Sequence, residues 1–379
     1  MKKEEVRTLV ILCVMVLAAI FVGWKFVGPA FASYGPDKMH PLLFIGLNLI
    51  IAFLINIIAL EALHVLGAII GGYSITAFNI LKICIYKNAD NKWKLGWQEY
   101  EGFMGETKIA PKKEKPNIKP YIWCPLFGYA IELATCIVLY TSISKGASGE
   151  GIKATWIAVS ALIFILASSI IALYNFIPFK LDSMTDGYRL VLLNKEVNIK
   201  AYNEVLKIED LHRQGKSVEN VTVFDEITEY TASLNIIALY KCLEKGDLSK
   251  ANEIVSKLIE NKKVLDEYQF NRLIAQKLYI EVLTNDVEKA KSLYDELCTD
   301  EMRRFIANDI SMESIRAYIL IAGMIEESEG EVLFAKSRVE KAMKKTYKFQ
   351  AEVEQKLLKD ALEFVYKAHP KWNKENLAK

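Results

Sequence analysis

Several ionisable and amide side chains lie in or beside apolar blocks of this sequence, where they are costly to bury. Glu61 and His64 are three residues apart in one block, and that spacing places them beside each other on a helix. Asn175 and Asp186 flank the end of another block. Imidazole and carboxylate groups act as metal ligands or general bases when they face a reaction site, and otherwise they pair with one another. These residues are therefore the candidates for chemistry.

Four apolar blocks in the first half of the chain must position these residues. Each block reaches the roughly 20 residues that a helix needs to cross the hydrocarbon core of a lipid bilayer. We therefore expect about four transmembrane helices, over residues 8–27, 41–70, 121–143 and 154–177. The first block has a second reading, because Ala30-Phe31-Ala32 after it resembles a signal-peptide cleavage site. Residues 1–30 are accordingly either an N-terminal transmembrane helix, which could be a signal anchor, or a signal peptide that is cleaved.

The distribution of charge predicts the orientation of these helices. Residues 82–119 carry nine lysines against five acidic residues, whereas the other connections are short and nearly neutral. Positively charged connections stay in the cytosol, so both ends of the chain should be cytosolic too. The expected location is the cell membrane, as a multi-pass protein with a cytosolic C-terminal domain. Glu61 and His64 then lie towards the cytosolic side, at the same depth as the segment from Asn175 to Asp186.

Two sequence motifs carry a family resemblance. Leu60-Glu61-Ala62-Leu63-His64 differs by one residue from H-E-x-x-H, and Asn175-Phe176-Ile177-Pro178 is followed by Asp186-Gly187. The pair, in this order on membrane helices, resembles the site-2 protease family of intramembrane zinc metalloproteases. Gly71-Gly72-Tyr73-Ser74 is also similar to the continuation found in bacterial members. The resemblance covers residues 41–190, and it implies a helical membrane core and membrane-protein or peptide substrates.

The resemblance also implies roles for individual residues. His64 and Asp186 match two of the three zinc ligands, and Glu61 matches the general base that activates the zinc-bound water. Asn175 matches the residue that helps to position substrate. A zinc metalloendopeptidase is the activity that this arrangement would carry.

One position departs from the family pattern. Leu60 stands where the first histidine ligand belongs, and a leucine side chain cannot bind zinc, which normally takes three protein ligands and water in a catalytic site. Glu132 or Asp182 are the possible substitute ligands. Without a substitute, the chain is a pseudoprotease that serves as a membrane scaffold or regulator. In that case Glu61 and His64 would pair with each other or with Asp186.

The segment between the second and third apolar blocks predicts a short cytosolic β-hairpin. Residues 74–86 and 93–97 have strand-like patterns on either side of a turn signal at residues 87–92. In the resembled family such a strand can pair with an extended substrate. The alternative is a hairpin anchored at the membrane interface by Trp93, Trp97 and Tyr100. Residues 111–120, which are rich in lysine, read as a linker.

The second half of the chain, residues 198–379, predicts a soluble domain of amphipathic helices. The segments 246–251, 285–290 and 329–335 open helices in similar ways, with alanines 39 and then 45 residues apart. This spacing is longer than the tetratricopeptide period, so irregular helical hairpins of that type are expected. Such hairpins could form a concave surface for a partner peptide, or simply a compact helical domain.

The whole sequence therefore predicts an all-α protein: a polytopic membrane domain with one β-hairpin, followed by a soluble helical domain. A nucleic-acid partner is not expected, because no basic cluster is interleaved with aromatic residues. The six cysteines contain no C-x-x-C pair, so a disulfide framework or a thiolate zinc site is not expected either. A transporter that uses Glu132 is a third reading, but the four blocks show no repeated half.

Overall fold

A computed structural model describes most of the chain. It covers residues 41–97, 105–146, 152–178, 185–284, 286–346 and 348–373, together with short stretches between residues 9 and 27. The chain divides into two compact units, residues 1–199 and residues 200–379. Most of the described residues are helical, and the first unit also contains a small antiparallel sheet.

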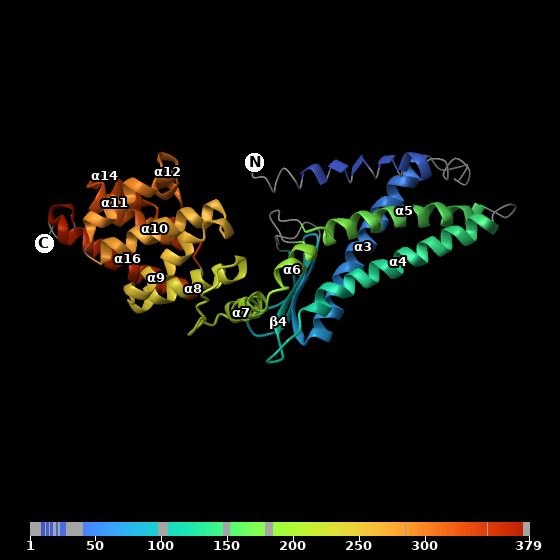
Figure 1. Ribbon diagram of the computed structural model, residues 1–379, viewed down its shortest axis with the longest axis horizontal. Helices are drawn as coiled ribbons and strands as arrows, with labels where there is room; N and C mark the ends of the chain where they lie inside the picture. Colours follow the sequence, from blue (N-terminus) through green and yellow to red (C-terminus); the bar gives the residue numbers. More distant parts are fainter. Residues whose placement is uncertain are drawn as a thin grey trace. The chain divides into compact units, whose positions relative to one another are not determined.

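Three long helices form the frame of the first unit. They are α3 (Pro41–Gly71), α4 (Lys119–Gly146) and α5 (Ile152–Phe176), and they pack side by side (Figure 1). Residues 43–71, 119–139 and 159–176 within them are long and apolar enough to cross a membrane. The first predicted crossing, residues 8–27, lies largely outside the described residues, which include the π-helix η1 (Gly23–Val27).

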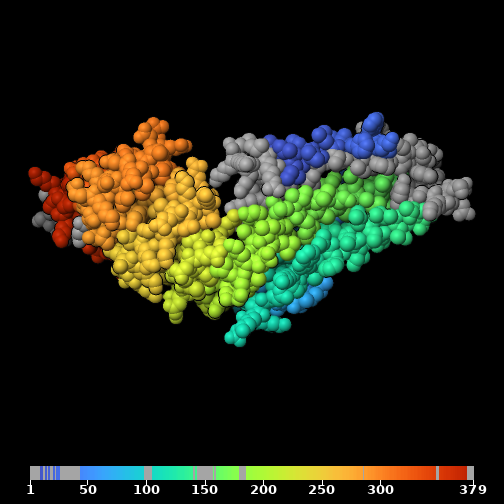
Figure 2. Space-filling view, viewed as in Figure 1, coloured from blue at the N-terminus to red at the C-terminus, as the bar shows by residue number. Residues whose placement is uncertain are grey.

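The burial pattern of these helices suits a lipid environment. Many large apolar side chains point outward, among them Ile50, Phe127 and Ile131, which are 60%, 66% and 68% exposed. One small apolar cluster between α3 and α5 is formed by Phe44, Val159 and Ile163. Helices with this distribution gain little from packing in water, whereas a bilayer would cover their outer faces. The contact between α4 and α5 can be followed along both helices in Figure 2.

A four-stranded antiparallel sheet follows α3, in the order β3-β2-β1-β4. The strands are β1 (Tyr73–Ile80), β2 (Ile83–Lys87), β3 (Trp93–Trp97) and β4 (Gly105–Pro111). The predicted hairpin is present as β2 and β3, which pair from Ile83 with Trp97 to Lys87 with Trp93. The chain is mostly helical as predicted, but the sheet is larger than the single predicted hairpin, because Leu81 ends β1 with a positive φ and β4 adds a fourth strand.

The second unit is built from helices that fold back on one another (Figure 1). Helix α6 (Asp186–Leu192) belongs to the first unit, and α7 (Glu196–Arg213) runs across the division. The elements that follow are α8 (Glu229–Lys245), α9 (Leu248–Glu260), η2 (Lys262–Val264), α10 (Glu267–Leu283), α11 (Val287–Leu297), α12 (Asp300–Asn308), α13 (Met312–Leu320), η3 (Ile321–Ile325), α14 (Glu329–Ser337), α15 (Val339–Met343), α16 (Lys348–Ala368) and η4 (Pro370–Trp372).

The three helix starts predicted for this unit are where α9, α11 and α14 begin. Asp247 and Asp286 cap the first two of these helices by accepting hydrogen bonds from the backbone N–H groups of Lys250 and Lys289, both at 3.1 Å. Side-chain caps of this kind satisfy backbone donors that a helix leaves unpaired at its start. The predicted alanines at positions 251, 290 and 335 are fully buried, which lets neighbouring helices approach closely. A tetratricopeptide-like class for this unit remains a prediction.

Candidate functional site

The two sequence motifs meet where α3 and α6 come together. The ring Nε2 of His64 lies 3.2 Å from Oδ2 of Asp186, and both side chains are about 95% buried. Thr185 caps the start of α6. Its hydroxyl also donates to the carbonyl of Ile177 at 2.9 Å, which connects the start of α6 to the end of α5. Gly187 allows this close approach, since a Cβ there would lie 2.0 Å from the Phe176 carbonyl oxygen.

The other ring nitrogen of His64 is held by α4. Its Nδ1 lies 3.0 Å from the backbone carbonyl oxygen of Tyr121, and the two rings are 4.5 Å apart. A carbonyl oxygen can only accept, so Nδ1 is the donor in this contact. Nε2 faces a carboxylate oxygen of Asp186, which also accepts. The two contacts together suit an imidazolium ring that donates from both nitrogens and forms an ion pair with Asp186.

Glu61 is held separately, by the edge strand of the sheet. The Thr107 hydroxyl of β4 lies 2.6 Å from Oε2 of Glu61 and donates a hydrogen bond to it. The Tyr121 hydroxyl donates to the Thr107 carbonyl at 3.0 Å, so the same residue of α4 positions both the strand and the His64 ring. Gly105, the first residue of β4, leaves room for the Glu61 side chain, since a Cβ at this position would lie 2.8 Å from it.

Arg189 adds a positive charge beside this cluster. Its guanidinium lies 3.5 Å from Oδ1 of Asp186, one turn further along α6. Burial alone would raise the pKa of the Asp186 carboxyl, but the adjacent His64 ring and the Arg189 guanidinium outweigh burial and lower that pKa. Asp186 is therefore a carboxylate shared between two cationic groups.

The residues present do not fit a catalytic zinc ion with three protein ligands. Leu60 offers no ligand atom, and within the described ranges no three His, Cys, Asp or Glu side chains are grouped so that they could hold one metal ion. Both nitrogens of His64 already have partners, and Arg189 would repel a metal cation bound at Asp186. The arrangement suits a buried ion pair better than a metal centre.

Glu132, the first proposed substitute ligand, is bound elsewhere. It lies on α4, where Ser168 of α5 donates to its Oε1 at 2.6 Å. The same Ser168 hydroxyl lies 3.0 Å from Oδ1 of Asn56 on α3, so the three residues join three helices. The Glu132 carboxylate therefore points towards Ser168. Within the described residues it is not grouped with His64 and Asp186 as a metal ligand. Asp182, the second substitute, lies outside the described residues.

Asn175, the predicted substrate-positioning residue, lies near the cluster but not in it. It is half-buried on the last turn of α5 and faces the Tyr129 hydroxyl of α4. Tyr129 in turn lies within electrostatic reach of Glu61 and Asp186.

Three residues of the site were not identified from the sequence. Arg189 lies three positions after Asp186, so helical spacing could have pointed to it. Thr107 lies on β4 between a glutamate and a lysine, and no local signal marked this segment as a strand. Tyr121 acts through its backbone carbonyl as well as its hydroxyl, and a sequence pattern does not reveal a backbone contact.

Comparison of the chain with protein-family models, with curated proteins and with solved structures finds no match.

Proposed function

We propose that this protein is a site-2 protease-like membrane protein that has lost zinc-dependent proteolysis and acts as a membrane scaffold or regulator. The observation that supports the ancestry is the meeting of Glu61, His64 and Asp186 in one buried cluster, although the two motifs lie far apart in the chain. The loss of activity follows from Leu60, which leaves two of the three expected ligands, and these two form an ion pair.

In this proposal the former catalytic residues stabilise the fold. His64 and Asp186 join α3 to α6, and Glu61 joins α3 to β4 through Thr107. Ionisable groups inside a membrane domain are satisfied by such partners when they do no chemistry. The membrane core would then present a surface to another membrane protein without cutting it.

The proposal includes a location and a partner class. The protein would lie in the cell membrane as a multi-pass protein, with the lysine-rich segment and the C-terminal unit in the cytosol. Its partners would be the lipid bilayer and a membrane protein or peptide, which the helical unit would bind.

Metal analysis of the purified full-length protein tests this proposal. We expect zinc well below one ion per chain and no proteolysis that a chelator abolishes. Leu60→His restores the missing ligand type one helical turn from His64, so zinc should rise towards one ion per chain. Leu66→His is the matched control, because Leu66 lies on the same helix and is 49% exposed.

Two results would overturn the proposal. Stoichiometric zinc in the unchanged chain, lost in Asp186→Ala, would show that a third ligand exists. Chelator-sensitive cleavage of a membrane-protein substrate, lost in Glu61→Gln, would show that Glu61 still acts as a base.

A further inference from the structure

Helix α16 of the soluble unit packs against elements that lie far from it in the sequence. It contacts α13, η3 and α8, whereas α8 packs with α9, α10 with α11 and α13 with α14. All residues of α13 from Ser314 to Leu320 are buried. Because α13 is buried on every side, other helices must pack around it, and α16 packs against one of its sides.

The contact between α16 and α13 centres on a buried ion pair. Nε of Arg316 donates to Oε2 of Glu354 at 3.0 Å, and Arg316 is fully excluded from solvent. Its guanidinium lies over the Tyr279 ring of α10, 4.5 Å from the ring centroid, and 5.9 Å from that of Tyr240 on α8. In the part of the chain that the structure describes, Glu354 is the carboxylate that hydrogen-bonds to Arg316. The pairing of this arginine thus depends on α16.

Both a side chain and a backbone carbonyl of α16 lie close to the elements around Arg316. A Cβ at Gly323 in the π-helix η3 would lie 2.6 Å from Cγ2 of Val365, so only glycine leaves room for α16 there. The Tyr279 hydroxyl donates to the Leu357 carbonyl at 3.4 Å. Short π-helical turns occur frequently at functional sites, and this one receives a side chain of α16.

The buried residues of α16 have the spacing of a helix that binds in a groove. Glu354 is followed by buried aliphatic residues three, four, seven and eleven positions later, at Leu357, Leu358, Ala361 and Val365. Recognition of an amphipathic helix by a groove uses anchors with this spacing. In α16 this row of buried residues begins with Glu354, which accepts a hydrogen bond from Arg316.

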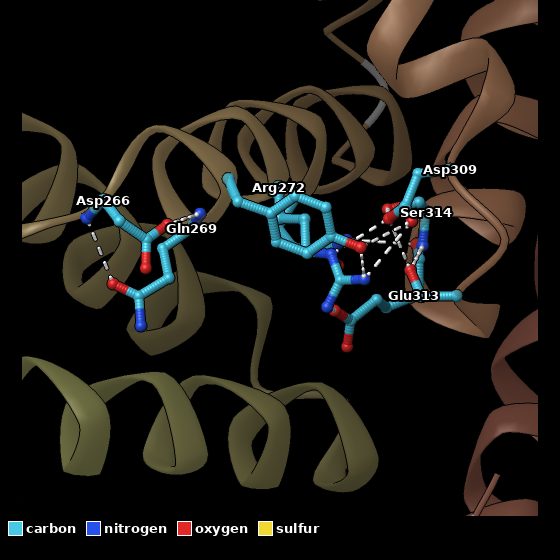
Figure 3. Close-up of polar contacts among 9 residues, drawn as sticks. Asp266, Gln269, Arg272, Asp309, Glu313 and Ser314 are labelled. Carbon is cyan, nitrogen blue, oxygen red and sulfur yellow. Dashed lines mark hydrogen bonds and ion pairs between the residues drawn. The ribbon is translucent and has the colours of Figure 1, made fainter. Parts of the chain in front are cut away.

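The arginine-bearing face is held in place without α16. Figure 3 shows Arg272 of α10 between Asp309 and Glu313, at 2.9 Å from each carboxylate. Ser314 donates to the same Asp309 carboxylate at 2.6 Å, and Gln276 donates to the Glu313 carbonyl at 3.1 Å. These contacts fix α10 against α13 one turn from Arg316. A face that is ordered before its ligand binds loses less freedom on binding.

We propose that Tyr240, Tyr279, Arg316 and Gly323 form a helix-binding site, which we term the Arg316 face, and that α16 is its tethered occupant. The free ligand is an amphipathic helix of a partner protein that displaces α16. That helix carries a carboxylate followed by small or aliphatic residues with the α16 spacing. The proposal concerns the soluble unit, so it does not depend on the chemistry of the membrane unit.

Tethering explains how such a site could be regulated. A segment joined by a short connection has an effective concentration on the order of millimolar, so α16 excludes weak ligands. A partner helix binds only when it competes with α16 or when α16 is released.

The test uses the full chain in detergent with a specific protease site inserted after Lys345, between α15 and α16. The probe is a fluorescein-labelled peptide of residues 348–373. We expect the labelled peptide to exchange into the cleaved chain and not to bind the uncleaved chain. A peptide with Glu354→Lys should bind roughly 30-fold or more weakly, because it places a cation against Arg316. A peptide with Glu363→Lys is the matched control, because Glu363 is exposed and should be replaceable without effect.

Several outcomes would overturn the proposal. A cleaved chain that is folded but does not bind the peptide would contradict it. A Glu354→Lys peptide that binds as tightly as the parent peptide would also contradict it. Light scattering that shows a dimer joined by exchanged α16 helices would make a second copy of the chain the occupant and would also contradict it.

Hydrogen exchange on the uncleaved Glu354→Lys chain covers the case in which cleavage unfolds the unit. We expect α16 to lose protection while α9 and α11 keep theirs. Loss of protection in all of these helices together would show that α16 is part of the core, and the proposal would fail.

Discussion

His64 on α3 and Asp186 on α6 face each other at 3.2 Å inside the first unit, and each also contacts a second polar group. Breaking a buried ion pair by removing one partner costs about 3–5 kcal/mol, because the other charge stays buried without compensation. Asp186→Leu should therefore destabilise the membrane unit by about 3 kcal/mol. Unfolding of the full chain in mixed detergent micelles, followed by tryptophan fluorescence, measures the change.

The double variant His64→Leu/Asp186→Leu separates an ion pair from a working metal site. Replacing both partners of a buried pair with apolar residues is often close to neutral, so most of the lost stability should return. A double variant as unstable as the sum of the two single variants would contradict the pairing.

Gly67 on α3 lies where the backbone of α4 comes closest. A Cβ at this position would lie 2.3 Å from the Pro120 carbonyl oxygen and 2.7 Å from the Tyr121 Cα, and neither atom can turn away. Gly67→Ala should therefore cost about 1–3 kcal/mol, as overpacking does, and displace the Tyr121 carbonyl from His64. Thermal unfolding of the full chain in detergent measures the cost.

Gly46→Ala is the control for this substitution. Gly46 lies on the same helix, but nothing surrounds its Cβ position within 4 Å. Alanine has the better helix propensity, so this variant should be neutral or slightly more stable. Equal losses in the two variants would mean that α3 and α4 do not meet at Gly67.

The sequence predicted the parts of this site that depend on helix spacing and membrane depth. Hydropathy placed three of the long helices, because a bilayer selects apolar runs of a fixed length. The proximity of His64 and Asp186 was expected, because both motifs fall at the same end of their blocks. The periodicity and the length of an apolar run are properties of local sequence, so the helices and their shared depth could be predicted from them.

The sequence did not predict the contacts that depend on tertiary packing. Glu132 was one of two possible substitute ligands, but its position on α4 points it at Ser168, and helix rotation is set by neighbouring helices. No strand was predicted at β4, because edge strands carry charged residues that weaken the strand pattern. The position of α16 against Arg316 depends on long-range packing that no local pattern reports.

Asp309 in the second unit makes the stability of that unit depend on pH. Burial alone would raise the pKa of Asp309, but hydrogen bonds from Arg272, Ser314 and Ser311 outweigh burial and hold the pKa at about 2. The folded-state pKa lies below the unfolded value, so its contribution is present above about pH 4 and is lost as the pH falls towards 2. The contribution at neutral pH is about 2 kcal/mol.

Asp309→Asn should remove this contribution and flatten the acid part of the stability curve. Hydrogen exchange of α12 and α13 in the full chain, measured between about pH 2 and pH 5, reports the local free energy of opening across the range in which the contribution is lost. Asp295→Asn is the control, because the side chain of Asp295 is 67% exposed and its pair with Arg303 should contribute little. Equal effects from the two variants would show that the Asp309 hydrogen bonds do not stabilise the unit.

Ser168 of α5 joins the other two membrane helices through a single hydroxyl. It lies 2.6 Å from Oε1 of Glu132 on α4 and 3.0 Å from Oδ1 of Asn56 on α3. Hydrogen bonds between membrane helices contribute about 0.6 kcal/mol on average, with larger values at well-ordered sites. Ser168→Ala removes the hydroxyl from both neighbours at once, so we expect a loss of about 1–2 kcal/mol.

The adjacent Ser169 provides the control for this substitution. Ser169→Ala removes the same group at a half-buried position of the same helix, and it should change stability by less than about 0.5 kcal/mol. Glu132→Gln should be tolerated, because its amide can still accept from Ser168. If Ser168→Ala were neutral and Glu132→Gln strongly destabilising, the charge of Glu132 rather than its hydrogen bond would hold the three helices together.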